Sequence, residues 1–285
     1  LTTHSASPAT GCLLAASVYP YPCPCQMPER TPVDQDLSAW LSEQLRVTSF
    51  IQPSDNRPIG EWWESVAKEE PEVITNQKRL GVTQLEGSLD GGRLILRSEL
   101  ARVDWLLVAP AVEQWDGEGP PSLGVVDDVL VSFLGHLEGW FHSSLCPPSK
   151  RIALAGIALL PVPNQRSGYE KLQSFLRQWV NLGSEEVSDF VYQINRPVWR
   201  KVHGEELKVN RITKWSVGML RQMQTHADLS TSSFYSRSHS DFFCRLEYDL
   251  NNAPSDIELA VDAQLEFLDV LRNELQSEVF PGGSR

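Results

Sequence analysis

Residues 151–162, RIALAGIALLPV, constrain the fold most strongly, because their side chains are apolar at both odd and even positions. The run is shorter than the ~18 to 20 residues that a membrane-spanning helix needs. A short apolar run of this kind is typical of a central β-strand that is covered on both faces, although the pattern alone leaves a buried helix open. We therefore expect a sheet at the centre of the fold.

Alternating patterns predict further strands on both sides of this run. Between Gly81 and Pro110, apolar and polar side chains alternate in three segments, and the Asp-Gly-Gly turn at 90–92 predicts a hairpin between the first two. Residues 189–197, 206–220 and 242–250 show similar strand patterns, and the last of these alternates most clearly.

Helical spacing of apolar residues predicts several amphipathic helices. The segments 34–46, 60–70 and 126–145 show this spacing. Two capping boxes, Ser167 with Glu170 and Ser255 with Glu258, predict the starts of two more helices. The last helix would have an apolar stripe that includes Leu268, Leu271 and Leu275.

These elements predict an α+β fold, in which amphipathic helices pack on one side of an antiparallel sheet or sheets. A long helix follows a group of strands in each half, so the chain could contain two related halves of the order strand-strand-strand-helix. The predicted divisions are a leader at 1–26, an N-terminal helical segment at 27–78, a first α+β half at 79–148 and a second at 149–285.

The leader differs in composition from the rest of the chain. Residues 1–26 contain no Asp, Glu, Lys or Arg, and they lack the basic and apolar regions of a signal peptide. Cys23 and Cys25 are too close together for a zinc-binding pair, so we predict no metal there. Met27 is the first methionine, and we expect the leader to be disordered or untranslated and the working protein to begin at this residue.

Charge and cysteine content restrict the class of protein. A net charge of -12 argues against a general binder of nucleic acid or of anionic membranes. The two cysteines of the body, Cys146 and Cys244, lie far apart in the sequence, which fits a reducing cytoplasm. We therefore expect a cytoplasmic protein without a cofactor.

The segment 196–214 is a local exception to the acidic composition, with six Lys or Arg residues against two Glu. It could bind a partner, and nucleic acid could bind only here. The alternative is a solvated hairpin whose basic residues face acidic neighbours. The candidate binding residues are Arg196, Trp199, Arg200, Lys201, Lys208, Arg211 and Lys214.

Arg211 and the last helix each suggest a specific contact. Arg211 shares a strand face with Val209 and Trp215, so it should point inward and need a carboxylate, from Glu86 or from the last strand. The last helix has a strongly acidic outer face, which is either solvated or a docking surface for a basic partner. Its acidic residues are Asp256, Glu258, Asp262, Glu266, Asp269, Glu274 and Glu278.

Catalytic signatures are weak. Asp189, Glu206 and Lys208 have the residue types of a metal-dependent nuclease, in which carboxylates hold a cation and a lysine stabilises the attacking water. A single Glu-x-Lys sequence is common, however, and nucleophile-elbow, P-loop and dinucleotide-binding motifs are absent from the sequence. Whether the protein is an enzyme is therefore left open.

The sequences INRP, VNRITKWSV and CRLEYDLNNAP, followed by the acidic helix, resemble a sporadically distributed family of bacterial proteins of uncharacterised function. The resemblance covers the C-terminal third and implies no catalytic residues. It implies an accessory gene, including genes of mobile or defence-linked loci. We expect an accessory protein that binds a protein partner through the basic hairpin or the acidic helix; the alternative is a metal-dependent nuclease or other hydrolase.

Overall fold

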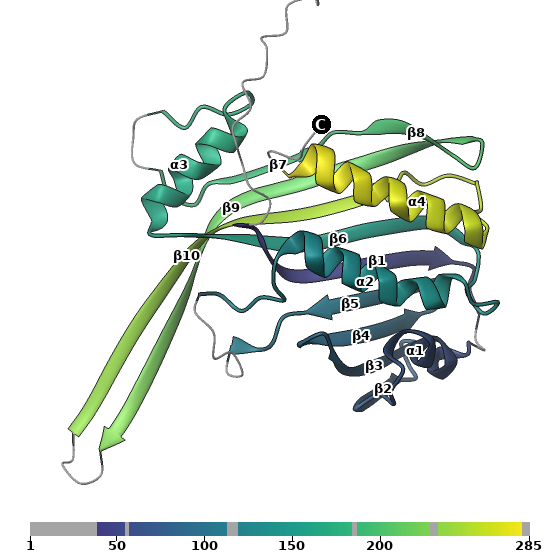
Figure 1. The fold of residues 1–285 in the computed structure, drawn as a ribbon, viewed down its shortest axis with the longest axis horizontal. Helices are drawn as coiled ribbons and strands as arrows, with labels where there is room; N and C mark the ends of the chain where they lie inside the picture. The colour runs from purple at the N-terminus through teal and green to yellow at the C-terminus, as the bar shows by residue number, and fades with distance from the viewer. Residues whose placement is uncertain (1–38, 55–56, 113–118, 184–186, 229–232, 281–285) are drawn as a thin grey trace, which may run out of the picture. The chain divides into compact units, whose positions relative to one another are not determined.

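A computed structural model describes residues 39–54, 57–112, 119–183, 187–228 and 233–280 (Figure 1). These residues form a ten-stranded antiparallel sheet with four α-helices packed against it, which confirms the predicted α+β fold class. The predicted leader lies outside the described residues.

The sheet has the strand order β2-β3-β4-β5-β1-β6-β10-β9-β7, and β8 pairs with β9. One edge is therefore β2, and β7 and β8 share the other. The strands are β1 (Leu41–Ile51), β2 (Val73–Gln77), β3 (Val82–Leu89), β4 (Gly92–Glu99), β5 (Arg102–Val108), β6 (Ser149–Val162), β7 (Val191–Asn195), β8 (Val198–Val202), β9 (Glu205–Asp228) and β10 (Ser233–Asn252).

The helices cover one face of the sheet, as predicted (Figure 1). Helix α1 contacts β3 and β4, α2 contacts β1, α3 contacts β9 and β10, and α4 contacts β6 and β8. Within the described part of the chain, no helix is both long enough and apolar enough to span a membrane. The helices are α1 (Ile59–Ala67), α2 (Val126–Phe141), α3 (Gln165–Leu176) and α4 (Val261–Glu274), and α4 continues into the π-helix η3 (Leu275–Val279).

One predicted helix is a strand, and two predicted helix starts are wrong. The predicted helix at 34–46 is strand β1 from Leu41 onward, because pairing with β5 on one side and β6 on the other outweighs the local helical spacing. Helix α3 begins after Asn164, whose side chain accepts the backbone N–H of Ser167, so Ser167 is not the cap. Helix α4 begins at Val261 rather than near Ser255.

Strand β6 lies at the centre of the sheet and is buried along most of its length, which confirms the strand prediction for this apolar run. Its second face is covered by charged side chains rather than by helices. Arg46 and Asp249 lie beside Ala155 on the two neighbouring strands, and their side chains meet at 3.6 Å. A second pair, Arg245 with Glu43, likewise joins the strands on either side of β6.

The close approach of the Tyr248 ring to β6 gives a test of this packing. A Cβ atom at Gly156 would collide with the Tyr248 hydroxyl oxygen and would lie 2.6 Å from the Gln44 carbonyl oxygen. Since the Gln44 oxygen belongs to the paired strand, we expect Gly156→Ala to lower the free energy of unfolding by roughly 2 kcal/mol.

Urea denaturation followed by tryptophan fluorescence measures this change. Gly135→Ala in α2 is the control, because apart from the adjacent backbone of α2 no heavy atom lies within 4 Å of the added Cβ. We expect the control to stabilise the protein by up to about 1 kcal/mol through helix propensity. Equal stability of Gly156→Ala and the wild type would contradict the packing described for β6.

Candidate functional site

The basic segment forms a β-hairpin from β8 and the first part of β9. His203 and Gly204 connect the strands with φ values of 50° and 90°, as a tight hairpin turn with left-handed residues requires. Side chains alternate along β8, so Arg200 lies on the side of α4, whereas Trp199 and Lys201 lie on the face where no described helix packs. The basic side chains are therefore divided between two faces.

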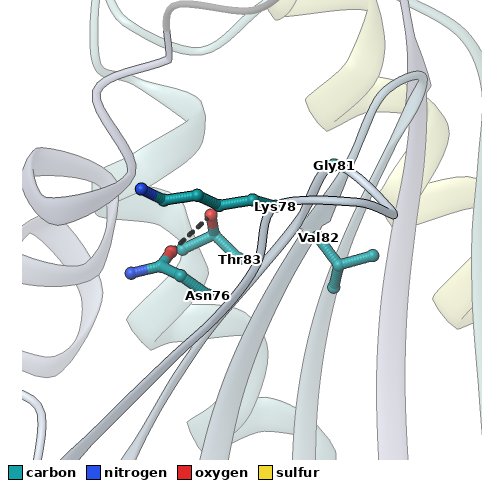
Figure 2. A pocket seen from close by; sticks show the side chains of 5 residues that line it. All are labelled: Asn76, Lys78, Gly81, Val82 and Thr83. Carbon is teal, nitrogen blue, oxygen red and sulfur yellow. Dashed lines mark hydrogen bonds between the residues drawn. The ribbon is translucent and has the colours of Figure 1, made fainter.

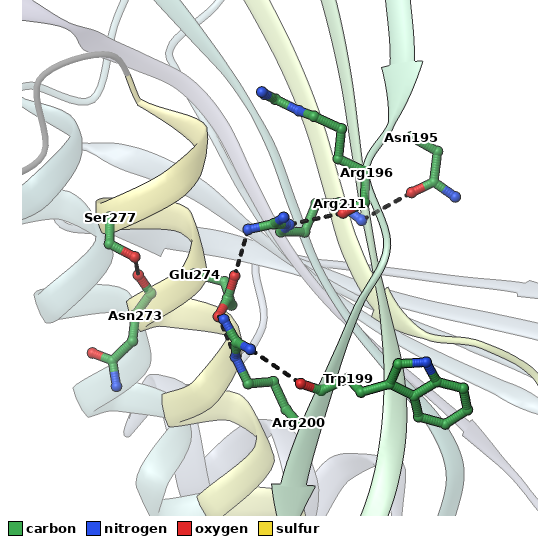
Figure 3. Close-up of polar contacts among 8 residues, drawn as sticks. All are labelled: Asn195, Arg196, Trp199, Arg200, Arg211, Asn273, Glu274 and Ser277. Atoms are coloured by element: carbon green, nitrogen blue, oxygen red, sulfur yellow. Dashed lines mark hydrogen bonds and ion pairs between the residues drawn. The ribbon is translucent and has the colours of Figure 1, made fainter. Parts of the chain in front are cut away.

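Glu274, the last residue of α4, connects this helix to both strands of the hairpin (Figure 3). Its side chain is only 6% exposed. One carboxylate oxygen accepts a hydrogen bond from Arg200 Nε at 2.5 Å, and the other accepts one from Arg211 Nη1 at 2.9 Å. The Arg211 side chain is itself only 16% exposed. Loss of one charge of this Glu274 ion triad would therefore leave a partly buried charge without its ionic partner.

The inward position of Arg211 and its need for a carboxylate are confirmed, but both predicted sources of that carboxylate are wrong. Glu86 binds Arg93 instead, and Glu247 of the last strand binds Lys214. The assignment of Glu274 to a solvated helix face is also wrong. Glu274 lies three residues after Leu271, and that spacing could have placed it on the buried stripe.

Two other basic residues of the segment also have contacts within the chain. The Arg196 guanidinium lies over the Trp179 ring, 4.3 Å from its centroid, a contact that the sequence did not indicate. Lys214 donates to Glu247 at 3.1 Å. Burial favours the neutral form of Glu247, but hydrogen bonds from Lys214 and Arg245 outweigh this effect and keep the pKa of Glu247 below its usual value.

The acidic face of α4 lies against the hairpin turn. The backbone N–H of His203 donates to the Glu266 carboxylate at 3.2 Å, and the His203 ring lies 3.6 Å from both Asp262 and Glu266. The acidic helix and the basic hairpin therefore face each other in part, as the solvated-hairpin alternative requires. Neither is wholly available as a docking surface.

Trp199, Lys201 and Lys208 remain on the helix-free face, and we call them the Trp199 corner. Lys208 lies directly opposite Trp199 in the β8–β9 register, and both lysines are exposed. The Trp199 side chain is 62% exposed, and in Figure 3 its ring points away from Glu274. The indole and the two ammonium groups are therefore accessible together.

The proposed nuclease residues do not come together. Asp189 lies just before β7, whose first residue, Val191, pairs with Ser216. Glu206 and Lys208 lie at the start of β9, so ten residues separate Glu206 from Ser216, or roughly 30 Å along a strand. Within the described ranges, no group of three or more His, Cys, Asp and Glu residues could hold a metal ion.

Cys146 and Cys244 are buried, and burial raises the pKa of each thiol to about 12. The reactive form of cysteine is the thiolate, which is scarce at neutral pH when the pKa is this high. Neither residue therefore has the environment of a nucleophile.

No family model matches this sequence, and no curated protein matches it. The function is therefore inferred from the geometry of the site. The resemblance of the C-terminal third to an uncharacterised bacterial family stays a prediction.

The Glu274 ion triad predicts a large effect of removing its carboxylate. Glu274→Ala leaves Arg211 partly buried without this carboxylate, and we expect the free energy of unfolding to fall by about 3 kcal/mol. Asp269→Ala on the same helix is the control. Asp269 is exposed and pairs with Arg272, so its loss should change stability by less than about 0.5 kcal/mol.

Urea denaturation of both variants and of Glu274→Gln tests the triad. Glu274→Gln keeps the size and one acceptor of the side chain but loses the charge, so we expect an intermediate loss. If Glu274→Ala costs no more stability than Asp269→Ala, the triad does not hold α4 on the hairpin.

Proposed function

We propose that this protein is a protein-binding module and that the Trp199 corner contacts an acidic segment of its partner. The observation that carries the proposal is the exposure of the Trp199 indole beside Lys201 and Lys208. Most of the other described tryptophans are buried in the core. Tryptophan is the residue type most enriched among binding hot spots, and the adjacent ammonium groups favour a carboxylate-bearing partner.

The distribution of the basic residues favours a protein partner over nucleic acid. Arg200 and Arg211 bind Glu274, and Lys214 binds Glu247, so three of the six cations of the segment face carboxylates of the chain itself. Nucleic-acid affinity comes largely from several phosphate contacts, and the net charge of -12 opposes it. Two lysines beside an indole suit a short acidic peptide segment better.

Contact at this corner would use side chains rather than strand addition. The outer edge of β8 is short, is preceded by Pro197 and contains Lys201, and these features discourage pairing with another strand. The carbonyl of Trp199 already accepts a hydrogen bond from the Arg200 side chain. The partner would therefore stack on the indole and place its carboxylates near the lysines.

The proposal predicts that Trp199→Ala weakens partner binding at least tenfold, a typical loss for a hot-spot residue. Quantitative affinity capture with the full chain as bait would compare the wild type with Trp199→Ala and with Lys201→Glu/Lys208→Glu. A protein that is captured by the wild type and lost with both variants supports the proposal. Since the substituted side chains are exposed, the circular dichroism and Tm of both variants should stay close to those of the wild type.

The matched control is Lys78→Glu/Arg79→Glu, which makes the same change of charge at the opposite edge of the sheet and should retain the partner. Fluorescence anisotropy with single-stranded DNA and RNA oligonucleotides provides the second arm. Equal capture by the wild type and Trp199→Ala would refute the proposal, and Trp199-dependent oligonucleotide binding would favour nucleic acid instead.

A further inference from the structure

Strand β2 forms an edge of the sheet whose outer side is unpaired among the described strands. Its neighbour in the sheet is β3, with Val73 opposite Glu86 and Gln77 opposite Val82. Ile74 is 59% exposed, and Val73 on the other face is exposed too. An edge of this kind presents backbone donors and acceptors beside apolar side chains, which is a template for another strand.

The two edges of the sheet differ in their protection. Pro197 precedes β8 and Lys201 lies within it, whereas β2 has the sequence VITNQ and β7 the sequence VYQIN, both without proline or charge. Proline and lysine are the usual means by which edge strands avoid pairing with other chains. Pairing is therefore discouraged at β8 and open at β2.

A shallow apolar hollow of about 440 Å³ lies beside the start of β2. Ile59, Pro71, Ile74 and Leu85 supply its apolar lining, and Glu70 lies at its rim. At the other end of β2, Leu80 in the turn to β3 is 69% exposed, the largest exposed fraction among the described large apolar side chains. One end of the strand thus has an apolar recess and the other an apolar projection.

Charges of opposite sign flank β2. Glu69 and Glu70 precede the strand, and Lys78 and Arg79 follow it; all four are exposed. Figure 2 shows the turn at the basic end, where Lys78 extends beside Asn76 and Thr83, whose side chains are joined by a 2.9 Å hydrogen bond. An antiparallel neighbour with the reverse order of charges would match both ends.

We propose that a second copy of this chain pairs with β2, strand against strand, about a twofold axis near Thr75. Antiparallel pairing of identical strands places the start of each β2 beside the end of the other. The acidic flank of each copy then meets the basic flank of the other, twice in one interface. In this arrangement, Leu80 of one copy lies at the same end of the interface as the apolar hollow of the other copy, and the reverse is true at the other end.

These features fit a second copy of the chain. When an identical strand runs antiparallel to β2, its basic end lies beside the acidic end of the first copy and its acidic end beside the basic end. The twofold contact uses the same edge on both copies, so the assembly is a closed dimer. At the far edge, Pro197 and Lys201 oppose pairing of another strand with β8. The dimer leaves the Trp199 corner accessible at the far edge, so this inference goes beyond the proposed partner binding and is independent of it.

Charge reversal tests the dimer. We expect Lys78→Glu/Arg79→Glu and Glu69→Lys/Glu70→Lys each to weaken self-association more than tenfold, because like charges meet at both ends of the interface. An equal mixture of the two variants should restore a dimer, since both contacts between unlike copies are then attractive. Ile74→Lys should abolish association by placing a charge in the pairing edge.

Sedimentation velocity of the full chain from roughly 5 to 500 µM provides the measurement, since small interfaces are usually weak. Lys201→Glu/Lys208→Glu is the control with the same change of charge and should dimerise like the wild type. A wild-type chain that stays monomeric throughout this range would overturn the inference. So would a dimer that resists both charge reversals, or variants that fail to associate when mixed. None of these outcomes depends on partner binding at Trp199.

Discussion

The fold depends on strand β1, which pairs with β6 along nearly its whole length on one side and with β5 over residues 44–50 on the other. Backbone groups inside a sheet must be hydrogen-bonded, so this strand has two neighbours and no free edge. Its pairing joins the strands β2–β5 to the strands β6–β10 in one continuous sheet. The helices can then cover one face without interruption, with α2 in contact with both α1 and α4.

On the helix-free face, many charged side chains pair with one another, so few of them remain for binding a partner. On this face, long charged side chains join one strand to another: Arg46 reaches Asp249 across β6, and Lys214 pairs with Glu247 on the adjacent strand. On the helix side, the Glu274 ion triad uses two further arginines. Functional surfaces are therefore expected where this pairing stops, at the two edges of the sheet. One edge presents an exposed indole with two lysines, and the other an unprotected strand.

Much of the fold could be predicted from local patterns. Alternation and the 90–92 turn predicted β3 and β4 with nearly correct ends, because side-chain alternation and turn chemistry act over a few residues. Helix α2 was predicted from the helical spacing of its apolar residues, which is likewise a local property. Strand β1 was missed because its apolar residues also satisfy helical spacing, and only its two partner strands distinguish the alternatives. The candidate site was predicted as a segment, but not the division of its side chains between two faces.

The sequence alone determined which residues alternate along strands such as β3, β4 and β10, where the 90–92 hairpin turns and that Arg211 would need a carboxylate. These properties follow from spacings of two to four residues, which the chain carries wherever it folds. Only the tertiary structure decided that Glu274 supplies this carboxylate, that Trp199 lies outside the core and that β2 and β8 lie at opposite edges. Such contacts join residues far apart in the chain, and they depend on which strands become neighbours. Strand order is a property of the whole sheet, so local periodicity does not contain it.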